Sequence, residues 1–536
     1  MFKEDENIVP RDGSNAPSES RARTVTADFP DAHAQIAPDR PAVIMADTGR
    51  VVTYRELVAD SRSISALMWS RGLRHGDCVA ILMENNAELV KIAWAAQRTG
   101  LRYVTLSTRS SPEELGYILT DSAAQALFTS EKFLDAAISA LATTDMVKHR
   151  FAVGASREHF ENLAAAIGVN PSTEAVDECE GVDMLYSSGT TGRPKGIVAE
   201  LPLDPIGTPP GVAALLQSRW GFSSATVYLS PAPLYHAAPL RFNMAVHRYG
   251  GTTIVMERFV AETAMALIER HRVTHTQMVP TMMIRILKLP TEERQTYDVS
   301  SLQVLVHAAA PCPPDTKRGM IEWLGPIVHE FYSSTENALF TAIDSPEWLE
   351  HQGSVGRSLL GTVHILDEEG RELPPGETGV IWSENGLSFE YLNDAEKTAA
   401  SRNDRGWTTV GDLGYLDDGG YLYLSDRRVD LILSGGVNIY PREVEDVLAV
   451  HPKVSDAAVF GIPHDELGEV VHAVVRPVPS IEPGPDLEDE LLGYLSTKLA
   501  KYKLPRRIDF QSELPRHETG KLYKRVLRDQ YSRPDR

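Results

Sequence analysis

Short apolar runs alternate with helical patterns in the first quarter of the chain, and this alternation is the strongest constraint on its fold. Residues 78–83 form a continuous apolar run suited to a buried strand, 87–97 have the apolar spacing of a helix, and 102–106 resemble a second strand. The Ser-Pro-Glu-Glu sequence at 111–114 supplies an N-cap, a first-turn proline and a capping-box acid for another helix, before a third strand at 126–128. This β-α-β-α-β order predicts an α/β fold with mostly parallel sheets and helices on their faces.

The C-terminal part of the chain has a different pattern. Residues 414–427 alternate with period two around an Asp-Gly-Gly turn, which predicts a hairpin. After it, the pattern predicts a helix beginning near Pro441, short strands at 457–461 and 470–475, and a last amphipathic helix at about 487–499. We therefore expect a large α/β body followed by a small α+β lid.

Charge and cysteine content argue against several classes of protein. The chain of 536 residues has 53 Lys and Arg against 74 Asp and Glu, and the net charge of -21 does not suit non-specific nucleic-acid binding. Cys78, Cys179 and Cys312 are scattered and form neither a disulfide framework nor a Cys-x-x-Cys metal pair. The start has no apolar signal segment, and no run reaches the roughly 18 apolar residues of a membrane span. We expect a soluble cytoplasmic protein without nucleic-acid or integral-membrane partners.

The most informative segment is Tyr186–Gly196, with the sequence Tyr-Ser-Ser-Gly-Thr-Thr-Gly-Arg-Pro-Lys-Gly. Three glycines and four Ser or Thr side chains in eleven residues offer many backbone N–H groups and hydroxyl donors, with the ammonium group of Lys195 close by in sequence. A loop of this composition is suited to wrapping phosphate oxygens. The spacing differs from the Gly-x-x-x-x-Gly-Lys-[Ser/Thr] pattern of the Walker A loop.

This loop resembles the phosphate loop of the adenylate-forming superfamily, which includes acyl-CoA synthetases, peptide-synthetase adenylation domains and luciferases. Further motifs similar to those of the family follow in the expected order, and the resemblance spans about residues 40–525. They are Phe331–Glu336 (aromatic-x-x-Thr-Glu), Trp407–Asp412 (the ribose-binding Gly-Asp), Asp426–Arg427, Ser434–Pro441 and Pro515–Lys521 (Pro-x-x-x-x-Gly-Lys). The form of the acyl-pocket segment is closest to the aryl- and fatty-acid–CoA ligase branch.

The resemblance implies the fold of that family and a division of the chain. We expect a flexible tail at 1–28, an AMP-binding and acyl-pocket body at 29–426, a hinge at 427–430 and a mobile lid at 431–536 that carries a catalytic lysine. Val429 stands where the family usually has Asp or Lys, so the pivot residue of the hinge stays open.

The resemblance also implies ATP, Mg²⁺ and CoA as reactants, and it assigns roles to individual residues. Lys521 would bridge the substrate carboxylate and the α-phosphate, Thr335 would donate to that phosphate, and Glu336 would hold Mg²⁺ together with Thr191. Tyr332 would lie on the adenine, while Asp412 and Arg427 would bind the ribose hydroxyls. The complete ATP-binding set is Ser187, Ser188, Gly189, Thr190, Thr191, Gly192, Lys195, Ala308, Ala309, Ala310, Tyr332, Ser333, Thr335, Asp412, Arg427 and Lys521.

The segment Pro231–Met244 is similar to the family segment that lines the acyl pocket, with His236 at the gate and among the catalytic candidates. Amino-acid-activating relatives place an Asp just after this gate to pair the substrate ammonium. Ala237 and Ala238 stand here instead, and an unpaired ammonium would be buried at a cost of several kcal/mol. The predicted substrate is therefore a bulky apolar or aromatic acid without an α-amine. The predicted pocket residues are His236, Ala237, Met244, Met282, Ala308 and Ser333.

These observations predict a carboxylic acid–CoA ligase that forms an acyl-adenylate and then a thioester, with Ser434, Gly435 and Gly436 facing CoA. Three alternatives stay open: a stand-alone adenylation enzyme that loads a carrier protein, a non-catalytic nucleotide-binding relative, and a luciferase-type oxygenase. The sequence leaves open which acid is used and whether the chain forms a homodimer.

Overall fold

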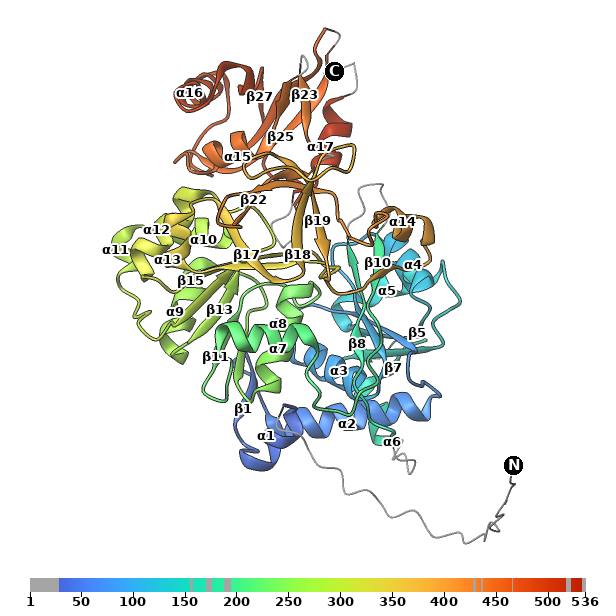
Figure 1. Ribbon diagram of the computed structural model, residues 1–536. Coiled ribbons are helices and arrows are strands. Elements are labelled where there is room, and N and C mark those ends of the chain that lie inside the picture. The colour runs from blue at the N-terminus through green and yellow to red at the C-terminus, as the bar shows by residue number, and fades with distance from the viewer. Residues whose placement is uncertain are drawn as a thin grey trace, which may run out of the picture.

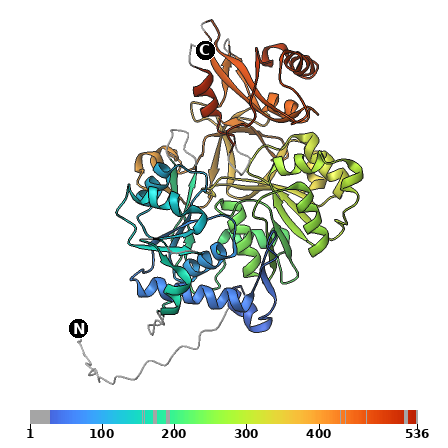
Figure 2. The ribbon, with the colours of Figure 1, turned by 180° about the vertical axis from the view of Figure 1, so that it is seen from behind.

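The structure is a computed structural model that describes residues 28–154, 157, 159–169, 176–187, 194–427, 430–434, 437–464, 466–516 and 522–532. Two large sheets with their helices form the body, and a smaller α+β domain lies beyond them at one end (Figure 1). The view from behind shows the same arrangement, with the C-terminal domain standing apart from the long N-terminal helices (Figure 2).

The first sheet of the body is six-stranded and parallel throughout, with the order β7-β6-β5-β3-β4-β8. Its central strand β3 is buried at every position, as a parallel strand covered on both faces should be. The strands are β3 (Cys78–Leu82), β4 (Arg102–Thr105), β5 (Ala124–Ser130), β6 (His149–Val153), β7 (Glu161–Asn162) and β8 (Val182–Asp183). The helices of this region are α1 (Pro30–Ile36), α2 (Tyr54–Ser70), α3 (Ala87–Arg98), α4 (Pro112–Asp121), α5 (Leu134–Leu141) and α6 (Leu163–Val169).

The second sheet has thirteen strands, and its direction of pairing changes along the sheet. From β1 to β15 the neighbours are parallel, whereas β15, β16, β17, β22, β21, β19 and β18 pair antiparallel. The strands are β1 (Pro41–Met45), β2 (Val51–Thr53), β11 (Val227–Ser230), β12 (Thr252–Val255), β13 (His275–Met278), β14 (Val304–His307), β15 (Val328–Ser333), β16 (Phe340–Ile343), β17 (Ser354–Leu360), β18 (Thr362–Leu366), β19 (Gly379–Glu384), β21 (Asp412–Leu416) and β22 (Leu422–Arg427).

Six helices follow or connect the strands of this second sheet. Two of them, α7 and α8, pack against one another, and so do α10 and α12. The six are α7 (Gly211–Trp220), α8 (Ala237–Arg248), α9 (Ala261–His271), α10 (Pro280–Leu287), α12 (Pro314–Leu324) and α13 (Ser345–Glu350). A single helical turn, α11 (Thr291–Arg294), lies between α10 and α12 in the chain.

A short three-stranded sheet brings together segments that are about 200 residues apart in sequence. Its order is β20-β10-β9, and Ile197 of β10 pairs with Tyr391 of β20. The elements are β9 (Leu185–Ser187), β10 (Lys195–Val198), β20 (Glu390–Tyr391) and the helix that follows β20, α14 (Ala395–Ala400). Because β9 and β10 flank the glycine-rich segment, this sheet holds both ends of it.

The C-terminal domain has its own sheet and its own core. Its strands β24, β23, β26 and β25 follow one another, and β27 pairs with β26. Ile432, Val444, Val459 and Leu491 belong to a core that is separate from those of the body. The elements are β23 (Ile432–Ser434), β24 (Val437–Ile439), α15 (Pro441–Ala449), β25 (Val454–His464), β26 (Gly468–Pro477), α16 (Pro485–Ser496), β27 (Ile508–Phe510) and α17 (Lys524–Tyr531).

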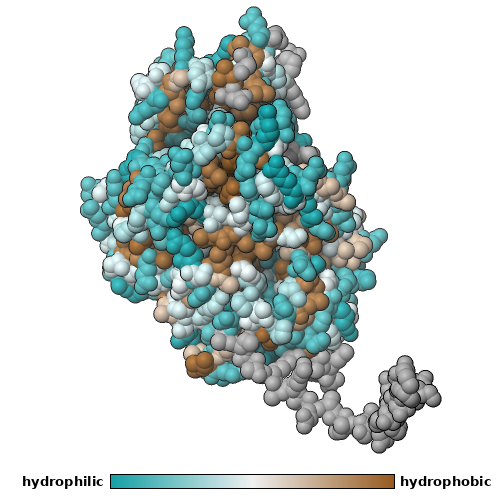
Figure 3. All heavy atoms as spheres, in the orientation of Figure 1, coloured by the Kyte–Doolittle hydropathy of each residue, from teal (hydrophilic) through white to brown (hydrophobic). Residues whose placement is uncertain are grey.

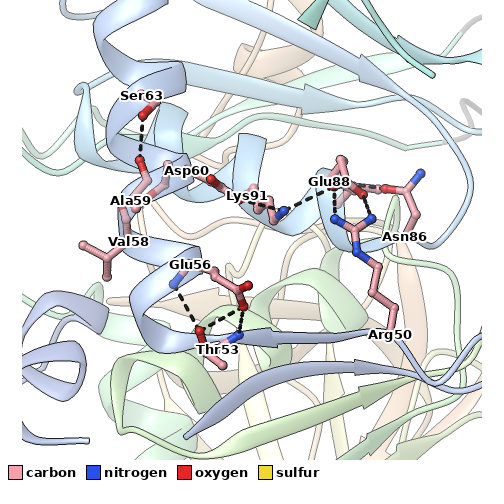
Figure 4. A network of polar contacts seen from close by, with 12 residues as sticks. Arg50, Thr53, Glu56, Val58, Ala59, Asp60, Ser63, Asn86, Glu88 and Lys91 are labelled. Atoms are coloured by element: carbon pink, nitrogen blue, oxygen red, sulfur yellow. Dashed lines mark hydrogen bonds and ion pairs between the residues drawn. The ribbon is translucent and has the colours of Figure 1, made fainter. Parts of the chain in front are cut away.

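Polar contacts fasten the start of α2 to α3 (Figure 4). Thr53 and Glu56 form a reciprocal capping box at the start of α2. Lys91 of α3 pairs with Asp60 of α2 at 2.7 Å, and its neighbour Glu88 accepts a bidentate contact from Arg50 at 3.0 and 2.7 Å. This network fastens α3 to α2 and to the segment before β2.

The structure confirms the predicted order of elements in the first quarter of the chain, including the capping box of Ser111 and Glu114 at α4. The hairpin expected within 414–427 is formed by β21 and β22. One prediction is wrong: the helix at 487–499 is not the last one, because α17 follows in the basic C-terminal stretch. That helix packs Leu527 against Phe460, so an apolar stripe exists there among many charges. Residues 1–27 of the predicted tail lie outside the described part. No helix in the described ranges combines the length and apolar character needed to cross a membrane.

Candidate active site

A cavity of about 490 Å³ opens where the three-stranded sheet meets the second sheet. Residues from β9, β10, α7, α8, the end of β13, β15 and α14 line it, so it joins segments from residue 186 to residue 411. The lining residues are Tyr186, Lys195, Val212, Leu216, Ala232, His236, Ala237, Ala238, Pro239, Arg241, Phe242, Gln277, Val279, Ala308, Ala309, Phe331, Ser333, Ser334, Thr335, Glu336, Asn337, Phe340, Tyr391, Lys397, Ala400, Ser401, Thr409, Val410 and Gly411.

One part of the cavity is polar and charged. The hydroxyl of Tyr391 donates to Oε1 of Glu336 at 2.9 Å, and the ammonium nitrogen of Lys397 lies 4.0 Å from the centre of the Tyr391 ring. Lys195, at the start of β10, lines the same part. Burial and the neighbouring Lys195 lower the pKa of Lys397 to about 7. Two ammonium groups held close together beside one carboxylate form a site suited to an anion of more than one charge.

The other part of the cavity is apolar and aromatic. The Phe331 and Phe340 rings stack with centroids 4.9 Å apart, and the Phe242 ring lies 6.1 Å from Phe331. Leu216 and Ala308 belong to the same buried cluster. An apolar ligand, or the apolar body of an acid, can be buried here.

An apolar groove adjoins this aromatic part on the surface. Val212 of α7 lines both the cavity and the groove, and the groove continues over Leu215, Leu359 and Leu387. Leu359 is 46% exposed and Leu387 39%. Figure 3 shows apolar residues gathered in the middle of this face of the molecule. The cavity therefore has apolar surface beside it as well as inside it.

Most of the predicted residues that the structure describes come together in the cavity. Lys195, His236, Ala237, Ala308, Ala309, Ser333, Thr335 and Glu336 line it. Ala309 has a φ of 74°, in the left-handed region that a residue with a Cβ seldom adopts, so the backbone at this wall is strained. Ser333 donates its hydroxyl to the carbonyl of Leu339 at 2.7 Å, which fixes the start of the Ser-Ser-Thr-Glu turn.

Other predicted residues lie elsewhere. The hydroxyl of Tyr332 donates to Oδ2 of Asp412 at 2.7 Å, so the two residues predicted to hold adenosine contact each other, outside the cavity lining. Ala310 does not line the cavity either. Met244 packs in the core under the first sheet and Met282 in the core of α9, α10 and α12, and neither lines the cavity. Ser434, predicted to face CoA, lies at the end of β23, half-buried and paired with Val437 and Gly468.

Several predicted residues lie outside the described part of the chain: Ser188, Gly189, Thr190, Thr191, Gly192, Gly435, Gly436 and Lys521. The side chains of Ser187 and Arg427 lie outside it as well. Their assignments stay predictions from the sequence.

The structure adds polar residues that the motifs did not indicate. Tyr391 and Lys397 reach the cavity through the pairing of β20 with β10, and Gln277 reaches it from the end of β13. Arg241 of α8 lines it too, held by Asp183 at 2.9 Å and by the Asn337 side chain at 3.2 Å. None of these residues has a local signal in the sequence, since β13 reads His-Thr-Gln-Met and Gln277 does not stand out in it as a polar residue.

Among the described residues, no group of three or more His, Cys, Asp or Glu side chains is arranged to hold a metal ion. A magnesium ion bound to nucleotide phosphates needs only one or two protein carboxylates. Glu336, in the polar part of the cavity, fits that requirement.

Comparison with known proteins places this site in a family. The model of the AMP-binding enzyme family matches residues 30–388, which is more than half of the chain, and the model of the AMP-binding enzyme C-terminal domain matches residues 443–521. The chain belongs to the AMP-binding enzymes. The cavity-lining residues from Tyr186 to Phe340 lie within the first matched region, and the small C-terminal domain contains the second.

Relatives and solved structures agree with this assignment. A 2-succinylbenzoate–CoA ligase of Bacillus licheniformis is 32% identical over 504 residues, which cover 92% of this chain and 98% of the relative. A long-chain-fatty-acid–CoA ligase of Mycobacterium tuberculosis is 30% identical over 93% of this chain and 97% of its own length. The structure of o-succinylbenzoate CoA synthetase from Bacillus subtilis, in complex with an acyl-adenylate intermediate, superimposes with a TM-score of 0.76 at 29% identity, over 95% of this chain and 98% of the other.

Proposed function

We propose that this chain is an ATP-dependent carboxylic acid–CoA ligase that acts on a bulky apolar or aromatic acid. The observation that carries this proposal is the cavity, because one part of it is cationic and polar and the other is apolar and aromatic. Such a cavity is suited to join a nucleotide phosphate to an apolar acid. The relatives are named as acid–CoA ligases, which supports the same activity for this chain.

The reaction we propose has two steps. In the first, a carboxylate oxygen attacks the α-phosphorus of ATP, the bond to the β-phosphate oxygen breaks, and pyrophosphate leaves. In the second, the thiolate sulfur of CoA attacks the acyl carbonyl, the bond to the adenylate oxygen breaks, and AMP leaves. Neither step needs a covalent bond to the protein, so the protein acts by positioning and by stabilising charge.

The residues of the polar part meet the charge requirement of the first step. The substrate carboxylate and the triphosphate of ATP, which are both anions, must approach each other, and pyrophosphate then leaves with negative charge. Lys195 and Lys397 would bind the β- and γ-phosphates, Thr335 would donate to the α-phosphate, and Glu336 would hold the magnesium that accompanies ATP. A bound magnesium ion would supply further positive charge to the phosphates. Lys521 would reach the α-phosphate from the C-terminal domain.

The remaining assignments follow the sequence prediction. Tyr332, Asp412 and Arg427 would bind adenosine, and His236 with Ala237 would stand at the entrance of the acyl part. We propose a body at 29–426, a hinge at 427–430 and a lid at 431–536 that turns after adenylation and presents Ser434 and its neighbouring glycines to CoA. The three buried cysteines, Cys78, Cys179 and Cys312, form no disulfide, which suits the reducing cytoplasm.

The apolar part supports the proposed substrate class. Ala237 and Ala238 follow the gate, and neither can pair with a substrate ammonium. The groove that shares Val212 with the cavity gives room for an acid larger than a single ring. An amino acid would bury its ammonium group there without a partner.

A product screen by mass spectrometry tests the proposal. The protein, ATP, Mg²⁺ and CoA are incubated with fatty, aryl, polycyclic and steroid acids, with amino acids as controls. We expect AMP and an acyl-CoA from one class of apolar acid. An acyl-adenylate without any CoA ester would favour a carrier-protein acceptor, and no turnover of any acid would contradict the proposal.

The lysine in the C-terminal motif allows the two half-reactions to be separated. We expect Lys521→Ala to abolish adenylation while thioester formation from supplied acyl-adenylate continues, because its positive charge is needed only where the carboxylate meets the phosphate. Pyrophosphate exchange measures the first step, and CoA consumption measures the second. Equal loss of both activities would contradict the role given to Lys521.

A further inference from the structure

Gln277 is a buried polar residue in the wall of the apolar part of the cavity. It is 1% exposed and precedes the last residue of β13, between β11 and β14 in the sheet. Its neighbour Thr276 faces the other side of the strand, where its hydroxyl donates to the carbonyl of Leu229 at 3.0 Å. Gln277 is the residue of β13 that lines the cavity.

The hydrogen bonds of the Gln277 side chain are incomplete. Its Nε2 donates to the carbonyl of Met278 at 3.0 Å, whereas its Oε1 is fully buried and accepts no hydrogen bond from any described residue. By contrast, both ring nitrogens of His275, two residues earlier on the same strand, have a partner. Its Nε2 lies 2.9 Å from the carbonyl oxygen of Trp220, and its Nδ1 lies 2.8 Å from the hydroxyl oxygen of Thr274. Buried acceptors without a donor are rare because they lose their bonds to water, so this one calls for a specific explanation.

The surroundings of Gln277 restrict what that donor can be. On the neighbouring strand β11, Tyr228 pairs with His275 of β13, and its ring belongs to the aromatic cluster with Phe242 and Phe331. A cationic donor would have to leave water for this apolar environment without a counter-ion, at a high cost. A neutral O–H or N–H group on an aromatic ring meets the requirement, because the ring packs against phenylalanine rings while its substituent donates.

We propose that Gln277 determines substrate specificity: its Oε1 accepts a hydrogen bond from a neutral hydroxyl or amino group on the ring of an aromatic carboxylic acid. This inference rests on the proposed ligase function and narrows its substrate class from apolar acids in general to aryl acids that carry a ring donor. An acid that lacks the donor leaves the amide oxygen unpaired in the complex and binds more weakly, and a site with a buried polar group discriminates strongly for that reason.

The test compares acids in matched pairs. Aryl acids that carry a hydroxyl or an amino group at each ring position are compared with acids that carry hydrogen or methyl at the same position. For each acid, kcat/KM of adenylation is measured by pyrophosphate release with the full-length wild-type chain. At one ring position we expect the donor-bearing acid to be preferred by about 10- to 100-fold, the range expected for one buried acceptor left unpaired. The hydroxyl and amino series distinguish an O–H donor from an N–H donor.

Two variants separate the role of the amide from general effects. Gln277→Leu keeps the volume and removes the acceptor, so the preference should fall to about 1 while the affinity for AMP stays unchanged. Thr276→Val, on the same strand but on its other face, should keep the wild-type preference even if its melting temperature falls. If Gln277→Leu does not fold, the preferences of the wild-type chain still decide the question.

The outcomes distinguish this inference from the function on which it rests. A wild-type chain that forms acyl-CoA from aryl or fatty acids, but shows no preference for a ring donor at any position, overturns the role of Gln277 and leaves the ligase function intact. A preference that survives in Gln277→Leu overturns it equally. A chain that activates no acid overturns the ligase function and this inference with it.

Discussion

At the scale of single residues, His247 shows how burial fixes a protonation state. Its Nε2 lies 3.0 Å from the carbonyl of Ala42 and 3.0 Å from the hydroxyl of Thr253, while its Nδ1 accepts the indole N–H of Trp94 at 3.3 Å. Because an indole nitrogen only donates, Nδ1 must stay unprotonated, and the imidazole is neutral with its proton on Nε2. Burial lowers the pKa of His247 to about 4.

This shift makes stability depend on pH. The unfolded chain binds a proton to this residue below pH of about 6.5, whereas the folded chain does so only near pH 4, so the stabilisation is complete above pH 6.5 and is lost as the pH falls towards 4. We expect His247 to account for about 3 kcal/mol of that loss in unfolding free energy. Urea unfolding of wild type and His247→Gln at a series of pH values measures the difference. An equally steep decline in the variant would contradict the assignment.

Residue identities also show what the sequence could and could not predict. Thr335 and Glu336 were predicted from their motif, because residues adjacent in sequence stay adjacent in the turn that begins at Ser333. Met244 and Met282 were predicted for the pocket from residue type and approximate position alone. They pack in two cores, because the sequence does not define which face of α8 or α10 turns to the cavity.

At the scale of elements, prediction succeeded where the pattern is local. The strand β3 and the helix α4 were predicted from a continuous apolar run and from a capping box, and both signals are complete within a few residues. The short strand β20 has no such signal, since two residues carry no periodicity. Its position depends on pairing with β10, so no local pattern could place Tyr391 and Lys397 at the cavity.

The element β20–α14 supports a prediction about nucleotide binding. Asp394 caps α14 by accepting the backbone N–H of Lys397 at 2.9 Å, which points this turn of the helix at the cavity. We expect Lys397→Ala to raise the KM for ATP and the inhibition constant of pyrophosphate by about tenfold, the effect of one charge-assisted hydrogen bond. Inhibition by AMP should not change, because AMP lacks the β- and γ-phosphates.

Enzyme kinetics with each inhibitor check this expectation, and the matched control is Lys397→Arg, which keeps the positive charge. If Lys397→Ala weakens the binding of AMP and the binding of pyrophosphate to the same degree, the substitution distorts the cavity in general. That result would contradict a contact to the terminal phosphates.

At the scale of the whole molecule, polar contacts from Lys288 and Arg442 are among those that join the described parts of the C-terminal domain and the body. Lys288, just after α10, donates to the carbonyl of Val454 at the start of β25, and Arg442 of α15 donates to the carbonyl of Leu424 in β22 at 2.9 Å. The predicted division into body and lid came from a change of pattern along the chain. How the two parts meet could not be predicted, because single contacts between distant side chains and carbonyls leave no pattern in a sequence.

These contacts join the C-terminal domain to the body, and if that domain is the mobile lid we propose, weakening them should release it. We expect Lys288→Ala to increase the rate of limited proteolysis between residues 427 and 437 about five- to tenfold, since losing one hydrogen bond of about 1–1.4 kcal/mol shifts a two-state equilibrium by that factor. Lys453→Ala is the matched control. Lys453 is next to Val454 in the chain, but its ammonium group pairs with Glu490 within the C-terminal domain, at 2.6 Å. Mass spectrometry of the fragments measures both rates. If both variants are cleaved faster to the same degree, the charge on this surface matters and not the contact between body and lid. Faster cleavage of Lys288→Ala alone would identify Lys288 as a residue that sets the position of the lid.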